Sequence, residues 1–261
     1  MKAKTYVPHP CYTPKADEDH DDIALIELAT PVTNLGGPFA LVNGLNGSVD
    51  LPTGSSVTLA GFGTTKPDGT EASASLLEVG VKTVSKENCV KQNPKSNENK
   101  WINFDHVVCT GGEAGKDSCS GDSGGPAMLQ QGKDQWVVGV LSKGSQLPDA
   151  NGNCAVADRY GMYTLTSIYA GWIEAVISGQ AFECANGYDV SAGSCSCTGM
   201  ARNPVRTPWV GDIGSKGDAF DLSGGGSSDN QTVTIIGVCA GVGGAVLLCV
   251  GYIVYKSFTD R

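Results

Sequence analysis

Short runs of β-forming residues alternate with turn residues through residues 1–178, and this alternation restricts the chain to a mostly β body. Two clear runs are "SVTLAGFG" at 56–63 and "QWVVGVLS" at 135–142. The segments between such runs are rich in Gly, Pro, Asn and Asp, which favour turns. One later stretch, "TSIYAGWIEAVIS" at 166–178, spaces its apolar residues as a helix does. We therefore predict an all-β body that is closed by one terminal helix.

The composition fits a loop-rich β protein and excludes one class of partner. The chain has 261 residues, 36 glycines and 40% hydrophobic residues, which is enough for a buried core. Its formal net charge is -9, and Lys and Arg form no cluster. Nucleic-acid binding depends on basic patches that neutralise phosphates. We therefore exclude nucleic acids as partners.

The cysteines indicate an oxidising compartment. Two of the 10 fall within a long apolar run, and the others are irregularly spaced. Zinc modules use paired CxxC units with downstream histidines, which are lacking here, so disulfides are favoured. We predict neither a metal site nor a cofactor. The sequence leaves the pairing of four cysteines open: Cys11, Cys184, Cys195 and Cys197.

Residues 232–255 form an uncharged run that predicts a transmembrane helix. As an α-helix the run would be about 36 Å long, which exceeds the roughly 30 Å of a hydrocarbon core. A buried core helix is the alternative, but the run is too long and has no polar face. Lys256 follows it, so the positive-inside bias places the tail 256–261 in the cytosol and the rest of the chain outside. We expect a single-pass, type I membrane protein.

Two further features accompany this run. Gly237 and Gly241 form a GxxxG pattern that would let two helices pack closely, although chance spacing explains the pattern equally well. Residues 179–231 are rich in Gly and Ser and poor in large apolar residues. We predict that they form a flexible, cysteine-containing stalk between the folded part and the membrane.

The segment "DSCSGDSGGP" at 117–126 carries the clearest chemical signal. The glycines around Ser123 let the backbone turn sharply, which exposes the hydroxyl and frees backbone N–H groups for a developing oxyanion. An ordinary glycine-rich turn is the alternative. The surrounding segments disfavour this alternative, because they and 117–126 match segments of one known protein family in the same order along the chain.

The chain resembles the chymotrypsin/trypsin family of serine endopeptidases over about residues 5–178. The segment 117–126 resembles the family's nucleophile loop, and "HDDIALIEL" resembles the strand that bears the triad aspartate. "VVGVLSKGS" resembles the substrate-pairing strand, and "YGMYTLTSIYAGWI" resembles the last strand with its helix. The resemblance implies that Ser123 is the nucleophile and that Asp22 orients a histidine. It also implies an oxyanion hole made by the backbone N–H groups of Gly121 and Ser123.

The resemblance further implies two β-barrels, of which the first is incomplete. Residues 1–45 would be a remnant of the N-terminal barrel, residues 46–165 the C-terminal barrel and residues 166–178 the terminal helix. Together they would make a partial peptidase domain, 1–178.

Cleavage after Arg or Lys is the specificity that the resemblance implies. Asp117 stands where trypsin-like members place the carboxylate at the base of the primary specificity pocket. Gly144 and Gly161 match two positions where a side chain would block a long basic residue. With Ser142, these residues make up the predicted substrate-binding site. A solvated loop acid is the alternative interpretation of Asp117.

Disulfides also follow from the resemblance. It implies two bridges: Cys89 with Cys109, and Cys119 with Cys154. Val57 and Leu129 replace a third bridge that is common in the family, and we expect them to form an apolar pair. Lys143 replaces an aromatic residue and Tyr160 replaces a proline, so subsite preferences stay open. Asn46, within the sequon "NGS", is a predicted glycosylation site.

The family's general base is absent from the sequence as it stands. In the family its segment lies well before the aspartate strand, and neither that segment nor an apolar signal peptide precedes "KTYVPHPCYTP". His9 and His106 match non-catalytic positions, His9 within a surface loop. His20 and Asp22 would share a face of an extended strand, but only chance would bring His20 to Ser123. The chain alone is therefore expected to be nearly inert.

Three hypotheses follow. We favour a membrane-anchored, trypsin-like endopeptidase whose N-terminal part is missing from this sequence, because the nucleophile, triad aspartate and pocket residues are all kept together. The alternative is a membrane-tethered pseudoprotease that binds peptides or inhibitors without cleaving them. The third takes the chain literally, as a tail-anchored protein that faces the cytosol, where its disulfides should not form.

Overall fold

The computed structural model describes residues 3–9, 12, 21–29, 40–45, 47–66, 71–93, 102–144 and 154–178, together with the backbone of strands β10 to β16. The first strands are β1 (Ala3–Pro8), β2 (Ala24–Leu28), β3 (Leu41–Val42), β4 (Ser56–Gly61), β5 (Leu77–Lys82), β6 (Val107–Gly111), β7 (Pro126–Gln131), β8 (Asp134–Lys143) and β9 (Tyr160–Leu165). The helical elements are α1 (Lys86–Lys91), the 3-10 turn η1 (Thr166–Tyr169) and α3 (Ala170–Ser178). The later strands are β10 (Phe182–Glu183), β11 (Tyr188–Asp189), β12 (Ser194–Cys195), β13 (Ala201–Arg202), β14 (Thr207–Pro208), β15 (Val233–Ile236) and β16 (Tyr252–Tyr255).

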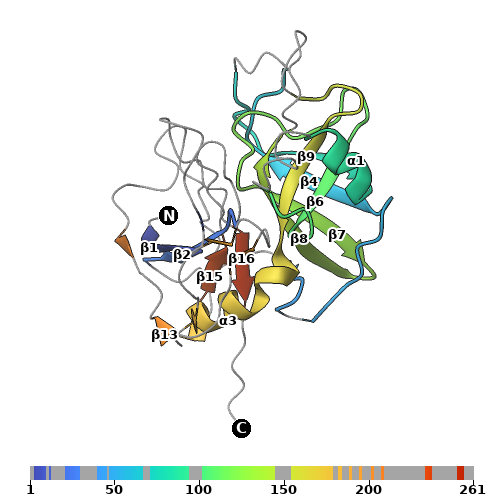
Figure 1. The fold of residues 1–261 in the computed structure, drawn as a ribbon. Coiled ribbons are helices and arrows are strands. Elements are labelled where there is room, and N and C mark those ends of the chain that lie inside the picture. Colours follow the sequence, from blue (N-terminus) through green and yellow to red (C-terminus); the bar gives the residue numbers. More distant parts are fainter. Residues whose placement is uncertain are drawn as a thin grey trace.

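One curled sheet forms most of the body (Figure 1). Its strand order is β5-β4-β7-β8-β9-β6, and β3 adds to β8 in parallel. Neighbours along this path pair antiparallel. A bridge between Thr83, which follows β5, and Thr110 of β6 joins the two ends of the order. The sheet therefore closes on itself as a barrel does.

Alternating apolar side chains of this sheet form its core. Along β4, Val57 and Leu59 are 2% and 3% exposed, whereas Ser56 is exposed. Val57 lies opposite Leu129 of β7 in the register. The apolar pair that the sequence predicted in place of a disulfide is therefore confirmed. Its core cluster has these other buried members: Leu59, Val81, Ala127, Val138, Leu141 and Tyr163.

The terminal helix packs against β1, β2 and the main sheet in one apolar cluster. Residues 166–178 fold as η1 followed by α3, and Figure 1 shows α3 beneath β1 and β2, next to the base of the main sheet. The apolar face of α3 is buried, as expected for an amphipathic helix on a sheet. One cluster joins the three parts: Val7, Ile23, Leu25, Val42, Val140, Tyr169, Trp172, Ile173 and Val176.

The described ends of the predicted transmembrane helix, 232–255, are extended. β15 pairs antiparallel with β16, and β15 also pairs with β2, where Ile235 lies opposite Ile26. Residues 237–251 lie outside the described residues. In the part of the chain that the structure describes, no helix has both the length and the apolar character needed to cross a membrane. Segments such as "VTII" are rich in β-branched residues, which explains the extended backbone at these ends.

Short strands also occur within the predicted stalk, 179–231. β10 pairs with β13, β11 pairs with β12, and β14 pairs with β1. The described residues of this segment are therefore extended and paired, whereas the composition predicted a flexible tether.

A disulfide should form when Val57 and Leu129 are both replaced by cysteine. Opposing residues of an antiparallel pair lie within the Cα separation that a disulfide bridges. Closing this long loop should raise the free energy of unfolding by about 2–4 kcal/mol. Peptide mass spectrometry would detect the bridge, and thermal unfolding would measure its effect. The single variant Val57→Cys is the matched control, and a double variant that is no more stable than this control would contradict the register.

Candidate active site

Asp22 lies two residues before the start of β2 and is held by two strands of the main sheet. It is 5% exposed. The Ser142 hydroxyl donates a hydrogen bond to Asp22 Oδ2 at 2.8 Å, and the Thr164 hydroxyl donates one to the Asp22 carbonyl oxygen at 3.0 Å. The pairing of β8 with β9 shifts register between Leu141 and Lys143, and such irregularities re-aim side chains. Ser142 sits at this shift and contacts Asp22.

Ser123 occupies a glycine-rich turn that leads into β7. Gly121 and Gly124 have φ angles of 95° and 83°, a left-handed conformation that favours glycine. Two backbone hydrogen bonds of 2.9 and 2.8 Å join this turn to Leu141. Ser123 itself is partly exposed. Because Leu141 precedes Ser142, the end of β8 holds both the Ser123 turn and Asp22.

The carboxylate of Asp122 accepts hydrogen bonds from the backbone. The Gly63 N–H donates to Oδ1 at 2.7 Å, and the Cys119 N–H donates to Oδ2 at 2.8 Å. A Cβ on Gly61 or Gly63 would approach this carboxyl group to 2.0 or 2.5 Å, so a side chain fits at neither position. Burial raises the pKa of Asp122, and the two N–H donors oppose the rise.

Asp117 has a similar environment. The Ser118 N–H donates to Asp117 Oδ1 at 2.8 Å, and the Ala155 N–H donates to Oδ2 at 3.2 Å. Burial raises the pKa of Asp117 to about 6 in spite of these donors, and the negative charge of Asp122 adds to the rise. Ionised Asp117 is therefore a destabilised anion that a cation would stabilise.

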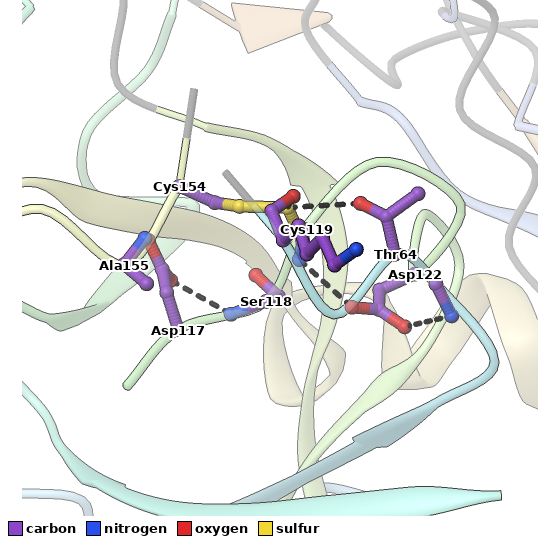
Figure 2. The surroundings of a disulfide bond; sticks show 9 residues. Thr64, Asp117, Ser118, Cys119, Asp122, Cys154 and Ala155 are labelled. Carbon is purple, nitrogen blue, oxygen red and sulfur yellow. Dashed lines mark hydrogen bonds between the residues drawn. A yellow bond between two sulfur atoms is a disulfide. The ribbon is translucent and has the colours of Figure 1, made fainter. Parts of the chain in front are cut away.

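The two carboxylates line the same cavity, of about 180 Å³. Figure 2 shows Asp117 and Asp122 on two sides of the segment that carries the Cys119–Cys154 disulfide. Glu78 and Lys66 also line the cavity, so acids outnumber bases among its described lining residues. Such a site favours a positively charged ligand.

Of the two predicted pocket glycines, Gly161 lies next to Asp117. A Cβ on Gly161 would lie 3.1 Å from Ser118 Oγ and 3.6 Å from Asp117 Oδ1. Gly144 follows β8 and is exposed. Beside Asp117, Tyr163 is fully buried, and burial raises the pKa of its hydroxyl. The structure therefore brings Asp117 and Gly161 together beside the buried Tyr163 side chain.

Both disulfides that the resemblance implied are present. Cys89–Cys109 joins α1 to β6. Cys119–Cys154 joins the segment after Asp117 to the segment that contains Ala155. The second bridge therefore keeps the Ala155 N–H next to the Asp117 carboxylate that it binds.

The described histidines contact groups other than Ser123. His9 is 5% exposed and lies edge-on to Tyr169 and Trp172, with ring centroids 5.1 and 5.0 Å apart. Burial lowers its pKa to about 4, so His9 is neutral near pH 7. The expected surface loop position of His9 is therefore wrong, because its ring fills an aromatic cluster. His106 faces the Tyr169 hydroxyl at 3.4 Å.

Sequence reasoning missed two supporting roles, and several of its predictions fall on residues that the structure does not describe. It placed Ser142 only in the substrate groove, whereas the hydroxyl of Ser142 binds Asp22. It assigned no role to "GFG" at 61–63, whose one signal is the close spacing of its glycines. His20 and Asn46 lie outside the described residues.

The family model described as Trypsin matches residues 1–173. The chain belongs to the trypsin family of serine proteases. Membership confirms the serine endopeptidase assignment at the level of the family. It also agrees with the mostly β, chymotrypsin-like architecture in which one sheet curls into a barrel.

Similar proteins include insect and mammalian proteases. The phenoloxidase-activating enzyme of Bombyx mori is 34% identical over 177 residues, which cover 66% of this chain and 38% of that protein. The CLIP domain-containing serine protease B4 of Anopheles gambiae is 33% identical over 169 residues, 64% of this chain and 44% of that protein. Coagulation factor IX of Oryctolagus cuniculus is 30% identical over 169 residues, 64% of this chain and 56% of that protein. The trypsin-family chain thus spans about half or less of the length of these relatives.

Replacing Asp117 by Asn should stabilise this trypsin-family fold at neutral pH. The pKa of Asp117 is about 6 in the folded chain against an ordinary value of 3.8, so the folded chain binds this proton more tightly than the unfolded chain. Ionisation of Asp117 therefore lowers the free energy of unfolding as the pH rises from about 4 to about 6. We expect Asp117→Asn to raise the free energy of unfolding by roughly 1–3 kcal/mol at pH 7 and by little at pH 4.

Thermal unfolding at the two pH values measures this effect. Asp134→Asn, at an exposed position of β8, is the matched control and should change the melting temperature little at either pH. An Asp117→Asn variant that is less stable than the parent at pH 7 would contradict the raised pKa.

Proposed function

We propose that this trypsin-family chain carries the nucleophile and the specificity pocket of a serine endopeptidase that cleaves after Arg or Lys. The observation that carries the proposal is the carboxyl group of Asp117, which is partly buried, has a raised pKa and lies beside Gly161. A buried carboxylate requires a cationic partner, and a substrate guanidinium or ammonium group supplies one. Because glycine has no side chain, position 161 leaves room for that long substrate residue.

In the proposed reaction, Ser123 Oγ attacks the carbonyl carbon of the scissile peptide bond. The Ser123 proton passes to a histidine oriented by Asp22, and this histidine protonates the leaving amine. The backbone N–H groups of Gly121 and Ser123 stabilise the oxyanion. Water then hydrolyses the acyl-enzyme. The Ser142 hydrogen bond supports the role of Asp22, because it fixes one carboxylate oxygen in a buried place.

Neither described histidine serves as the base in this proposal. The ring of His9 is enclosed by Tyr169 and Trp172, and the ring of His106 contacts Tyr169. Loss of the histidine from a triad lowers turnover on the order of a million-fold, as measured in another protease fold. We propose that the base is a histidine other than His9 and His106, and that the chain is nearly inactive without it.

Binding without cleavage is the second candidate function. The specific observation in its favour is the engagement of His9 and His106 with aromatic groups, while Asp117 and its pocket remain in place. Such a chain would hold peptides or protease inhibitors in the substrate groove. The reaction of Ser123 with an activity probe separates the two candidates.

We also propose that the protein is a single-pass, type I membrane glycoprotein whose peptidase part lies outside the cytosol. The uncharged run 232–255 and the basic residue Lys256 support the topology. The two disulfides support an oxidising compartment. Asn46 would carry the glycan, and Gly237 with Gly241 would permit weak helix dimerisation.

Ser123 of the natural protein should react with a phosphonate probe that carries a lysine-like side chain. We expect labelling about 100-fold faster than with the phenylalanine analogue, because the cation gains the Asp117 carboxylate. Asp117→Ser should abolish this preference, and Ser123→Ala should abolish labelling. Mass spectrometry of the labelled peptide provides the measurement. A preference for the phenylalanine probe would refute the specificity, and a lack of Ser123-dependent labelling in the natural protein would favour the binding function.

Deletion of residues 232–255 should release the protein from membranes. The full chain should stay in the pellet after alkaline carbonate extraction, because a spanning segment resists this treatment and a peripheral protein does not. Asn46→Gln should remove sensitivity to N-glycosidase. Asn230→Gln, in the second sequon "NQT" beside the proposed span, should leave this sensitivity unchanged and is the matched control. Recovery of the full chain in the carbonate supernatant would refute the proposed anchor.

A further inference from the structure

A buried carboxylate directly precedes Asp22 and accepts a hydrogen bond from a residue far along the chain. Asp21 is 7% exposed, and its φ angle of 55° lies in the left-handed region that residues other than glycine rarely adopt. The Tyr169 hydroxyl donates a hydrogen bond to Asp21 Oδ1 at 2.7 Å. Tyr169 belongs to η1, which follows the last strand of the main sheet. The direction in which the chain enters Asp22 therefore depends on how Asp21 is held.

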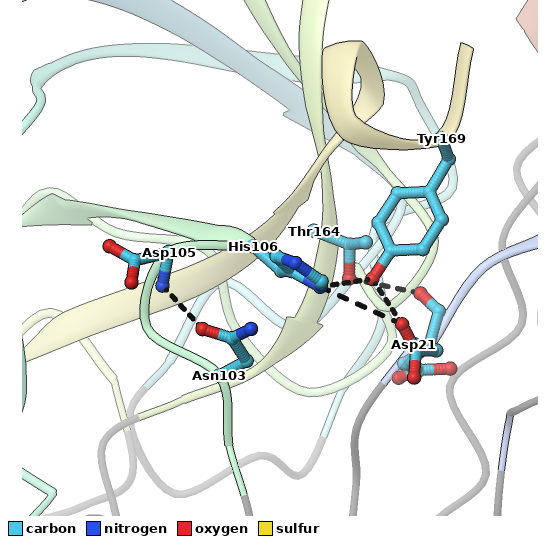
Figure 3. Close-up of polar contacts among 7 residues, drawn as sticks. Asp21, Asn103, Asp105, His106, Thr164 and Tyr169 are labelled. Atoms are coloured by element: carbon cyan, nitrogen blue, oxygen red, sulfur yellow. Dashed lines mark hydrogen bonds and ion pairs between the residues drawn. The ribbon is translucent and has the colours of Figure 1, made fainter. Parts of the chain in front are cut away.

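His106 extends this contact. Its Nδ1 lies 3.4 Å from Tyr169 Oη and 3.7 Å from Asp21 Oδ1. The His106 N–H donates to the Asn103 carbonyl, and the Leu165 N–H donates to the His106 carbonyl, both at 2.9 Å. These bonds fix the backbone from which the ring projects, and Figure 3 shows the rings of His106 and Tyr169 directed toward Asp21. The side chains of Asp21, Tyr169 and His106 thus form one polar cluster, which joins the segment before β2 to η1 and to the segment before β6.

The chemistry of the three groups fixes the direction of their hydrogen bonds. An ionised carboxylate only accepts, so the Tyr169 hydroxyl donates its hydrogen to Asp21. The Tyr169 oxygen is then an acceptor toward His106, and the Asp21 oxygen is an acceptor as well. With Asp21 ionised, a hydrogen on Nδ1 of His106 is the arrangement in which both oxygens accept, whether the ring is neutral or cationic.

We propose that His106 and Tyr169 are positioning residues that act through Asp21 to hold Asp22. A backbone in a sparsely populated conformation persists only where its surroundings impose it, and these two residues bind the Asp21 side chain. Ser142 fixes the Asp22 carboxylate from β8, so rotation at Asp21 would lengthen the 2.8 Å bond to Ser142. The catalytic meaning of this inference rests on the proposed function, whereas the structural coupling does not.

The protonation site of His106 provides the first test. In the full chain labelled with ¹⁵N-histidine, neutral His106 should carry its proton on Nδ1, and His106→Gln assigns the signal. Tyr169→Phe removes the hydroxyl that accepts from His106 and donates to Asp21, and it should lower the Nδ1–H fraction. A neutral His106 with its proton on Nε2 in the parent chain would overturn the proposal.

Coupling to Ser142 provides a test that needs no turnover. If His106 positions Asp22, His106→Leu should weaken the Ser142 bond, so a further Ser142→Ala should lower the melting temperature by less than it does in the parent chain. Asp21→Asn should rescue His106→Leu in part, because Asn still accepts from Tyr169, tolerates a left-handed backbone and removes the buried charge. Strictly additive losses for His106→Leu and Ser142→Ala would overturn the proposal.

The backbone effect is separated by a matched control. Asp158 also has a left-handed backbone, with a φ angle of 59°, but it is exposed. Asp158→Ala therefore reports the effect of alanine in that conformation alone, and Asp21→Ala should lower the melting temperature by several degrees more.

Kinetics of the complete, active protein add a final readout. His106→Leu should lower kcat about tenfold, equivalent to about 1.4 kcal/mol, with KM nearly unchanged, because Asp22 orients the base and does not bind substrate. Equal kcat values would overturn the catalytic meaning. If no form of the protein cleaves peptides, the proposed function fails. The protonation site of His106 and the coupling between His106→Leu and Ser142→Ala still decide the positioning role in that case.

Discussion

The hydrogen bond from Ser142 to Asp22 is the interaction on which the site depends. It joins residues that are 120 positions apart, one at the end of β8 and the other before β2. A buried carboxylate without hydrogen-bond donors is strongly destabilising, so this bond makes the buried position of Asp22 tolerable. Leu141, the neighbour of Ser142, holds the Ser123 turn. Ser123 and Asp22, the proposed nucleophile and triad carboxylate, are therefore positioned from the same strand end.

Apolar packing and polar contacts make different contributions to the assembly of this site. The cluster that contains Leu25, Trp172 and Ile173 supplies burial between β2 and α3, but apolar contacts are not directional. The polar contacts of Asp21 and Asp22 set the position of β2 along the main sheet, because hydrogen bonds constrain both distance and angle. A polar network of this kind specifies one arrangement among several that would bury similar apolar area.

Much of this fold and part of the site were predictable from the sequence, because their signals are local or are carried by the family resemblance. The alternation along "SVTLAGFG" predicted a strand that the structure contains, and the apolar pair of Val57 and Leu129 followed from the resemblance. The backbone hydrogen bonds to the Asp122 carboxylate were not predictable, since Gly63 approaches Asp122 only after folding. The burial of His9 was missed because "VPHP" resembles a surface turn, whereas an aromatic cluster from η1 and α3 encloses the ring.

The cavity that Asp117 and Asp122 share explains why this region requires so much rigid support. Two carboxylates that line one partly buried cavity repel each other, and burial already penalises their charged forms. Backbone N–H donors, the Cys119–Cys154 bridge and glycines that admit no side chain hold the two groups in spite of that repulsion. A loop free to move would separate the charges or expose them to water. The unfavourable electrostatics therefore persist only because the local fold leaves the carboxylates no alternative position, and a cation that enters this cavity is stabilised by both of them.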